Sequence, residues 1–318
     1  MSLCLVTGSY GFIGSNLVKH LLGLGRTVVA LGKGISNSED IECIRNNESR
    51  LLIPIFGSIL DQSLIREIFK TYKFDTVYHL AGQSSPPLSW SQPLQTMEIN
   101  FNGSVNILSG AIEAARTPSI VLVSSSAIYA PQKNATPIKE SAECKPVTPY
   151  GVSKLAMDQL ASIYTAVYGM RVISARPFFI IGPGKLNDVC SDWARNIVRI
   201  ERGELNWLPV GLIEGIARDF LSVSDAVSAL ITISEKGVSG EAYNICSGEA
   251  VSLSNILEIL KNDTRTTIVT RIDDSKTRPI EESIKVGNND KLSSLGWTRK
   301  DNIKQTIVDI LNYWRLKM

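Results

Sequence analysis

Short apolar runs rich in β-branched residues alternate with longer amphipathic stretches along the first 176 residues. Nearly continuous apolar strands are typical of a parallel sheet covered on both faces, and the amphipathic stretches between them are typical of crossover helices. The pattern therefore predicts a doubly wound α/β domain over residues 1–176. Its predicted strands are 3–7, 27–31, 51–55, 76–79, 120–123 and 171–175, and its predicted helices are 12–23, 62–72, 95–116 and 149–168.

The regular alternation stops beyond residue 176, where Pro, Gly and Trp become more prominent. We expect residues 177–318 to form a smaller, mixed α/β lobe whose boundary interleaves with the first domain. Two units also suit a length of 318 residues, at about 150 residues per domain. The predicted helices of this lobe are 189–202, 223–235, 253–261 and 302–316, and its predicted strands are 206–209, 242–245 and 267–272.

Composition and charge exclude several classes of protein. The chain has 33 Lys and Arg against 31 Asp and Glu, a formal net charge of +2, which favours neither nucleic acid nor an anionic membrane surface. No apolar run approaches the ~18 residues of a membrane span, and the first residues do not form a signal peptide. Five scattered cysteines without a C-x-x-C pair favour a globular protein of the cytoplasm. Neither of the two histidines has a second ligand at metal-site spacing, so we expect no metal site.

A glycine-rich turn joins the first predicted strand to the first predicted helix. Its glycines, Gly8, Gly11 and Gly14, stand three residues apart, as in dinucleotide-binding Rossmann domains. Glycine allows the tight turn and the close approach of a pyrophosphate, and the helix N-terminus at Phe12 and Ile13 offers N–H groups to the phosphates. These five residues are candidate cofactor contacts. A glycine turn that binds nothing is the alternative.

The end of the second predicted strand indicates which dinucleotide is bound. Dinucleotide folds usually place a carboxylate there to hold the adenosine ribose, but this chain continues with Gly32-Lys33-Gly34. A small residue leaves room for the 2′-phosphate of NADP, which Lys33 can neutralise and to which Ser36 and Ser38 can donate hydrogen bonds. We therefore expect NADP. NAD is the alternative, because it also binds without the acid, and Lys33 would then be a solvated loop residue.

The helix predicted at 149–168 carries Tyr150 and Lys154 in its first turns. A tyrosine and a lysine four residues apart lie on the same helix face. The ammonium group, together with a nicotinamide cation, lowers the pKa of a nearby phenol and makes it a workable general acid or base. For this spacing alone, a chance pair on a surface helix is the alternative.

Three serines, Ser124, Ser125 and Ser126, follow the fifth predicted strand. Ligands of a doubly wound sheet bind beyond the carboxyl ends of its strands, so these hydroxyls are expected to face the cofactor. One of them can bind a substrate oxygen while Tyr150 transfers a proton. The glycine turn, the serines and the Tyr/Lys pair thus occur on the elements that one active site requires.

These motifs resemble those of the extended short-chain dehydrogenases/reductases of the NAD-dependent epimerase/dehydratase family. The family places its catalytic hydroxyl four residues before a tyrosine, which implies Ser125 before Tyr129, with Ser124 and Ser126 as fallback candidates. Dehydratases of the family follow this hydroxyl with acidic residues, whereas this chain has Ser126-Ala127. The resemblance therefore implies an active site without the carboxylates that eliminate water.

The same resemblance implies further contacts to the dinucleotide. Tyr150 and Lys154 lie beside the nicotinamide and its ribose, and Gly32 and Lys33 lie beside the adenosine. An acid that the family commonly has after the third strand is replaced here within Gly57-Ser58-Ile59. The remaining implied cofactor contacts follow the third and fourth strands and are Ser58, Ile59, Leu80, Ala81 and Gly82.

The implied substrate is a nucleotide-diphosphate sugar, held mainly by the lobe 177–318. Two arginines, Arg218 and Arg278, match family arginines that grip the diphosphate, a task that suits the planar guanidinium. Segments 189–195 and 243–248 are similar to those of GDP-4-keto-6-deoxymannose reductases, although Phe179 replaces an asparagine that commonly contacts substrate. The implied substrate contacts are Gln83, Ser84, Ser85, Ser126, Phe179, Arg218 and Arg278.

The function that the resemblance implies is the NADPH-dependent reduction of the C4 ketone of a nucleotide-activated 4-keto-6-deoxyhexose. The nearest alternative is a nucleotide-sugar 4-epimerase that retains NAD, and an alternative of another class is a non-catalytic dinucleotide-binding redox sensor. Small and apolar residues on the helices 95–116 and 149–168 further imply a homodimer through a four-helix bundle. A face buried within one chain is the alternative reading of those residues.

Overall fold

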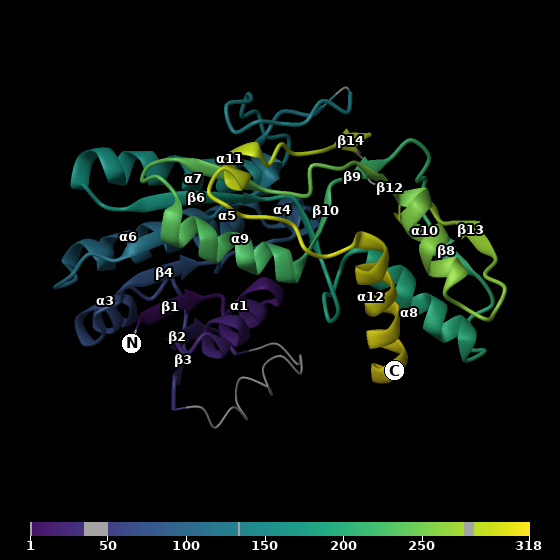
Figure 1. Cartoon of the computed structure of the whole chain (residues 1–318), viewed down its shortest axis with the longest axis horizontal. Coiled ribbons are helices and arrows are strands. Elements are labelled where there is room, and N and C mark those ends of the chain that lie inside the picture. The colour runs from purple at the N-terminus through teal and green to yellow at the C-terminus, as the bar shows by residue number, and fades with distance from the viewer. Residues whose placement is uncertain (1, 35–49, 133, 277–282) are drawn as a thin grey trace.

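A seven-stranded parallel sheet forms the centre of the computed structural model, which describes residues 2–34, 50–132, 134–276 and 283–318 (Figure 1). The strand order is β11-β6-β5-β4-β1-β2-β3, and every neighbouring pair is parallel. This is the order of a doubly wound dinucleotide-binding sheet with one strand added, so the predicted fold class is confirmed. The strands are β1 (Leu3–Thr7), β2 (Thr27–Gly32), β3 (Leu52–Phe56), β4 (Thr76–His79), β5 (Ser119–Val123), β6 (Val172–Pro177) and β11 (Ala242–Ile245).

Helices cover both faces of this sheet (Figure 1). On one face, α1 (Phe12–Gly23) and α9 (Val223–Lys236) share an apolar core with the strands. On the other face, α3 (Gln62–Thr71), α6 (Gly103–Glu113) and α7 (Pro149–Tyr168) form a second core. Except for the edge strand β3, the strands are largely buried from both sides, which is why they appear in the sequence as nearly continuous apolar runs.

The chain after residue 177 contributes to two places. Its elements α9 and β11 return to the central sheet, where β11 pairs with β6 at the edge. Three helices form a separate core in the lobe on the right of Figure 1, namely α8 (Val189–Glu201), α10 (Leu253–Asn262) and α12 (Ile303–Lys317). Short elements complete this part: β7 (Phe179–Ile181), β8 (Leu208–Val210), β9 (Ala217–Arg218), β10 (Phe220–Ser222), β12 (Val251–Ser252), β13 (Thr270–Ile272), β14 (Ile284–Lys285) and α11 (Asp290–Ser293).

The helix predicted at 95–116 is wrong in its extent and its continuity. Helical structure begins earlier, with α4 (Pro86–Ser91) and α5 (Pro93–Met97), because a proline occupies the first turn of each. A π-helical turn (Glu98–Asn102) then separates α5 from α6, and α6 ends at Glu113. Within the described ranges, no helix has both the length and the apolar character required to cross a membrane.

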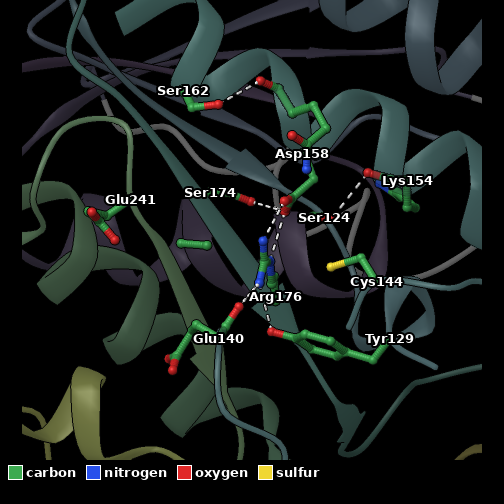
Figure 2. A network of polar contacts seen from close by, with 12 residues as sticks. Ser124, Tyr129, Glu140, Cys144, Lys154, Asp158, Ser162, Ser174, Arg176 and Glu241 are labelled. Atoms are coloured by element: carbon green, nitrogen blue, oxygen red, sulfur yellow. Dashed lines mark hydrogen bonds and ion pairs between the residues drawn. The ribbon is translucent and has the colours of Figure 1, made fainter. Parts of the chain in front are cut away.

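A buried ion pair ties α7 to β6 behind the sheet's carboxyl edge (Figure 2). Arg176 Nη2 lies 2.6 Å from Asp158 Oδ2, and Arg176 Nε donates to Asp158 Oδ1 at 3.0 Å. The same guanidinium donates to the hydroxyl of Tyr129 at 2.8 Å and to the carbonyl of Glu140 at 2.9 Å. The hydroxyl of Ser174 also donates to Asp158. Since Tyr129 follows the serine turn after β5, this cluster fixes that turn relative to α7.

We predict that Asp158→Asn destabilises the protein strongly, because it leaves the Arg176 guanidinium buried without its counter-charge. Breaking a buried pair from one side costs about 3–5 kcal/mol. The matched control is Glu241→Gln, which breaks the ion pair with Lys291 at a site where Glu241 is 54% exposed and where such pairs contribute ~0–1 kcal/mol. Urea unfolding of both variants is the measurement. Equal losses would show that the Arg176 cluster is not a structural anchor.

Candidate active site

The glycine turn after β1 is packed so tightly that side chains cannot replace its glycines. Gly8 has φ +68°, and a Cβ there would lie 2.7 Å from the backbone nitrogen of Ala81. A Cβ at Gly14 would lie 2.1 Å from the carbonyl oxygen of Gly8. The α1 N-cap, Gly11, has no side-chain cap, and the first turn carries no acidic residue. This N-terminus fits the pyrophosphate of a dinucleotide, which its N–H groups would bind.

A neutral histidine fixes the end of β4 against this turn. Thr7 Oγ1 is 2.8 Å from His79 Nδ1, His79 Nε2 is 2.9 Å from Ser104 Oγ, and the backbone N–H of Ala81 donates to Thr7 Oγ1 at 3.2 Å. Burial, and secondly the charge of Lys154, lower the pKa of His79 to about 3. His79 is therefore a structural residue. It places Leu80 and Ala81, two of the predicted cofactor contacts, beside Gly8.

The adenosine end of the predicted cofactor site lies at the ends of β2 and β3. Lys33 is exposed there, whereas Ser36 and Ser38 lie outside the described residues. The space into which a side chain at position 32 would point is filled, because a Cβ built on Gly32 would lie 2.6 Å from the ring of Tyr10. A larger residue at position 32 would therefore contact Tyr10, and the expectation that glycine leaves room for a 2′-phosphate beside Lys33 stays a prediction. After β3, Ser58 Oγ accepts from the N–H of Leu60 at 3.2 Å, and Ile59 is buried against Gly103 of α6.

The serine turn, Tyr150 and Lys154 meet at the carboxyl edge of the sheet. The side chain of Ser125 lies beside the phenol of Tyr150 and acts to lower its pKa, and the Ser125 Oγ accepts from the N–H of Ala127 at 3.1 Å. The ammonium of Lys154 donates to the carbonyl of Val123 at 2.8 Å. A Cβ on Gly82 would lie 3.4 Å from Lys154 Nζ, so the loop after β4 reaches the same place.

The other two serines of the turn have different surroundings. Ser124 is buried, and its hydroxyl donates to the carbonyl of Lys154 at 3.2 Å. Ser126 is buried at the start of a short 3-10 turn (Ser126–Ile128) that Ser125 caps. Ser125 is therefore the serine of the three that acts on the phenol of Tyr150.

Burial sets the electrostatics of this site. It raises the pKa of Tyr150, and the hydrogen bond to Ser125 offsets only part of that effect. The lowered phenol pKa expected from the sequence is thus wrong for the protein by itself, because the ammonium of Lys154 is directed to Val123. Burial also lowers the pKa of Lys154 from 10.5 to about 8, although the charge of Asp158 acts in the opposite direction. Tyr150 is consequently a protonated donor at neutral pH.

Asn100 supports the site and was missed in the sequence. Its Oδ1 accepts from the N–H of Gln83 at 2.7 Å, and its Nδ2 donates to the carbonyl of Gln83 at 3.0 Å and to Ser153 Oγ at 2.8 Å. Ser153 in turn donates to the carbonyl of Tyr150 at 2.7 Å. This role of Asn100 could not be recognised from the sequence, because the stretch 95–116 has the pattern of one continuous helix, whereas Asn100 lies in the π turn.

The predicted substrate residues after β4 are partly engaged with one another. The side chain of Gln83 accepts from the N–H of Ser85 at 2.6 Å and donates to its carbonyl at 2.9 Å. Ser85 caps α4 by accepting from the N–H of Leu88 at 3.3 Å. Ser84, between them, is exposed. This loop therefore offers the Ser84 side chain and a rigid backbone to a ligand.

A second group of predicted substrate residues lies at β7 and β9. Arg218 is buried, its Nη1 donates to the carbonyls of Ala217 and Ser283 at 2.8 and 3.2 Å, and its guanidinium lies over the ring of Phe179, 5.4 Å from the centroid. The substituted residue Phe179 thus packs on an arginine. Arg278, predicted to bind the same diphosphate, lies outside the described residues.

Asp219, next to Arg218, was also missed. Its two oxygens accept from the backbone N–H groups of Ser247, Gly248 and Gly287 at 2.6, 3.0 and 3.0 Å, and from the hydroxyl of Ser247 at 2.7 Å. Burial, offset in part by these bonds, raises the pKa of Asp219 to about 6. This carboxylate joins three segments of the lobe and so holds Arg218 in place.

Comparison with known proteins identifies relatives over the whole chain. GDP-6-deoxy-D-mannose reductase from Pseudomonas aeruginosa is 31% identical over 98% of this chain and 97% of its own. A solved structure of RMD from the same organism, complexed with NADPH, is 30% identical, with a TM-score of 0.86 over 100% of both chains. The UDP-glucose 4-epimerase of Thermotoga maritima, solved with UDP-glucose, is 25% identical, with a TM-score of 0.87 over 99% of both chains.

A family profile also matches most of the chain. The profile described as GDP-mannose 4,6 dehydratase matches residues 5–310, which include the glycine turn, the Ser125, Tyr150 and Lys154 group and most of the C-terminal lobe. The resemblance stated from the sequence motifs is thereby confirmed. The chain belongs to the GDP-mannose 4,6 dehydratase family, whose members are NAD(P)-dependent, nucleotide-sugar-modifying enzymes of the extended short-chain dehydrogenase/reductase type.

Proposed function

We propose that this enzyme uses NADPH to reduce the C4 ketone of a nucleotide-activated 4-keto-6-deoxyhexose. The observation that carries the proposal is the buried phenol of Tyr150, which lies beside the Ser125 side chain and whose pKa burial raises. A ketone reduction needs such a protonated donor beside the carbonyl oxygen. The similarity to GDP-6-deoxy-D-mannose reductase and to a structure complexed with NADPH supports the choice of reaction and cofactor.

Each residue of the site has a distinct task in this reaction. The turn Gly8–Gly14 binds the pyrophosphate, and the dinucleotide, when bound, supplies a hydride to C4. Tyr150 donates its proton to the oxygen of the former ketone, and Ser125 donates a hydrogen bond to that oxygen. Lys154 binds the nicotinamide ribose and keeps a positive charge near the phenol. Arg218 and Arg278 hold the diphosphate and so position the sugar ring.

The segment after Ser125 argues against dehydration as the reaction. Elimination of water from a sugar needs an acid and a base beside the catalytic hydroxyl. Here Ser126 is buried and Ala127 has no ionisable group. We therefore do not extend the dehydratase activity, after which the family profile is named, to this chain.

A nucleotide-sugar 4-epimerase is the second candidate. It would use the same Ser125, Tyr150 and Lys154 group to oxidise C4 and return the hydride with retained NAD. The epimerase of Thermotoga maritima is similar over nearly the whole chain, which favours this candidate. A non-catalytic redox sensor is less favoured, since binding alone does not require Ser125, Tyr150 and Lys154 to lie together at the carboxyl edge of the sheet.

We also propose that the enzyme is a homodimer across α7. Val152, Ile163 and Val167 lie on one face of this helix and are 47%, 49% and 67% exposed in the single chain. Apolar stripes of this kind on a surface helix usually face a partner. The occupant we propose is α7 of a second copy, together with α6.

The function is tested by incubating the protein with NADPH and a panel of 4-keto-6-deoxy sugars that carry GDP, dTDP, UDP or CDP. We expect one of these sugars to be reduced with the consumption of one NADPH per product. In the same assay Tyr150→Phe should reduce the rate by ~10²–10⁴-fold, because the proton donor is lost. Tyr168→Phe, at an exposed position of the same helix, is the matched control. Interconversion of 4-hydroxy sugars without net loss of NADPH would instead establish the epimerase.

The burial of Lys154 predicts a pH-dependent effect on stability. Below about pH 8 the folded protein holds a buried ammonium, and between pH 8 and 10.5 it has lost this proton while the unfolded chain retains it. Lys154→Met should therefore unfold with a free energy about 3 kcal/mol higher than the wild type near pH 7, and this advantage should disappear by about pH 10.5. Urea unfolding at several pH values measures it. Lys70→Met, at an exposed position, controls for the general loss of a positive charge, and parallel curves for the two variants would contradict the prediction.

The proposed dimer predicts that Ile163→Asp/Val167→Asp halves the mass measured by sedimentation. Carboxylates buried at an interface lose their hydration without a partner. Leu316→Asp, 86% exposed on α12, should leave the mass unchanged. A wild-type protein that sediments as a monomer at micromolar concentration would contradict the proposal.

A further inference from the structure

Two stacked aromatic residues, Tyr10 and Phe56, lie where we expect the adenosine of the cofactor to bind. Tyr10, inside the glycine turn, is only 6% exposed and belongs to the core on the α1 face of the sheet. Its ring stacks on that of Phe56, the last residue of β3, with centroids 5.4 Å apart and planes inclined by 12°. Phe56 in turn lies over Gly34, where a Cβ would come within 2.6 Å of the ring. Tyr10 is therefore held in one orientation.

The Tyr10 ring occupies the space that a side chain at position 32 would need. A Cβ built on Gly32 would lie 2.6 Å from Cδ2 and 3.3 Å from Cε2 of Tyr10. Gly32 is not among the glycines with positive φ, so its backbone conformation does not require glycine. The requirement comes from the ring, which cannot move aside without breaking its stack on Phe56.

Position 32 is the last residue of β2, where enzymes of this fold that use NAD place the acid that binds the ribose 2′-hydroxyl. We propose that Tyr10 is a specificity-determining residue for the dinucleotide, because its ring excludes an acidic side chain at position 32 and leaves the adenosine 2′ position to the exposed Lys33. Gly32 is then small because Tyr10 is large. This inference deepens the proposed use of NADPH and rests on it, because a carboxylate at position 32 would repel a 2′-phosphate while an ammonium attracts it.

The steric part of the proposal is tested on the protein without cofactor. Gly32→Asp should lower the thermal unfolding midpoint by about 5 °C in the wild-type background, because the core around Tyr10 is overpacked. In the Tyr10→Ala background the same substitution should lower the midpoint by less than half as much. Tyr10→Phe, which keeps the ring, should retain the full penalty. Equal penalties in all three backgrounds would overturn the proposal.

The specificity part is tested by calorimetric titration with NAD⁺ and NADP⁺. Relative to Tyr10→Ala, the double variant Tyr10→Ala/Gly32→Asp should bind NAD⁺ about tenfold more tightly and NADP⁺ about tenfold more weakly. The control Tyr10→Ala/Gly32→Asn has nearly the same size but no charge, and it should not weaken NADP⁺ binding to the same extent. A single Gly32→Asp variant that binds NAD⁺ as tightly as the double variant would overturn the proposal, and so would a double variant without any change in preference.

These outcomes are separable from those of the proposed reaction. A wild-type protein that prefers NAD⁺, or that interconverts sugars without consuming NADPH, would contradict the proposed function. The three unfolding comparisons would still decide whether the Tyr10 ring excludes a side chain at position 32, since they involve neither substrate nor cofactor.

Discussion

A buried chain of hydrogen bonds connects the glycine turn to Tyr150, the proposed proton donor. It runs from Thr7 at the end of β1 through His79 and Ser104 to Asn100, with Ser104 donating to the carbonyl of Asn100 at 2.6 Å, and then through Ser153 to the backbone of Tyr150. Each link would leave a buried polar group unsatisfied if it broke. Cofactor turn and catalytic helix therefore keep one relative position, which hydride and proton transfer to the same carbonyl group requires.

The buried ammonium of Lys154 lowers the stability of the fold, and it supplies a positive charge at the candidate active site. The ammonium of Lys154 is 5% exposed and donates to a carbonyl, without a carboxylate in direct contact. One turn along α7, by contrast, Asp158 is neutralised by two bonds from Arg176. A carboxylate at hydrogen-bond distance from Lys154 would stabilise the fold but would compete with the nicotinamide ribose that we propose Lys154 binds. Functional sites commonly accept such a cost.

The sequence was sufficient for the elements whose pattern is local and periodic. The predicted helices 12–23 and 149–168 begin and end at the same residues as in the structure. Each has an apolar face that packs on the sheet, and Thr148 caps the N-terminus of helix 149–168. The π turn at Asn100 could not be predicted, since its reason is a contact with Gln83 far from the helix pattern. The steric reason for glycine at position 32 could not be predicted either, because the Tyr10 ring that excludes a side chain there belongs to another loop and only the fold brings it close.

The return of the chain to the sheet after residue 177 has a consequence for how this protein is made. The edge strand β11 pairs with β6, and α9 covers the sheet, although 64 residues separate β11 from β6 and 45 residues separate α9 from β6. During synthesis the apolar face under α9 stays uncovered until that helix has left the ribosome. The unpaired edge of β6 is then open to misassembly for as long as translation of the intervening lobe takes. Uncovered apolar surface and an unpaired strand edge are the features that make partly folded chains prone to aggregation.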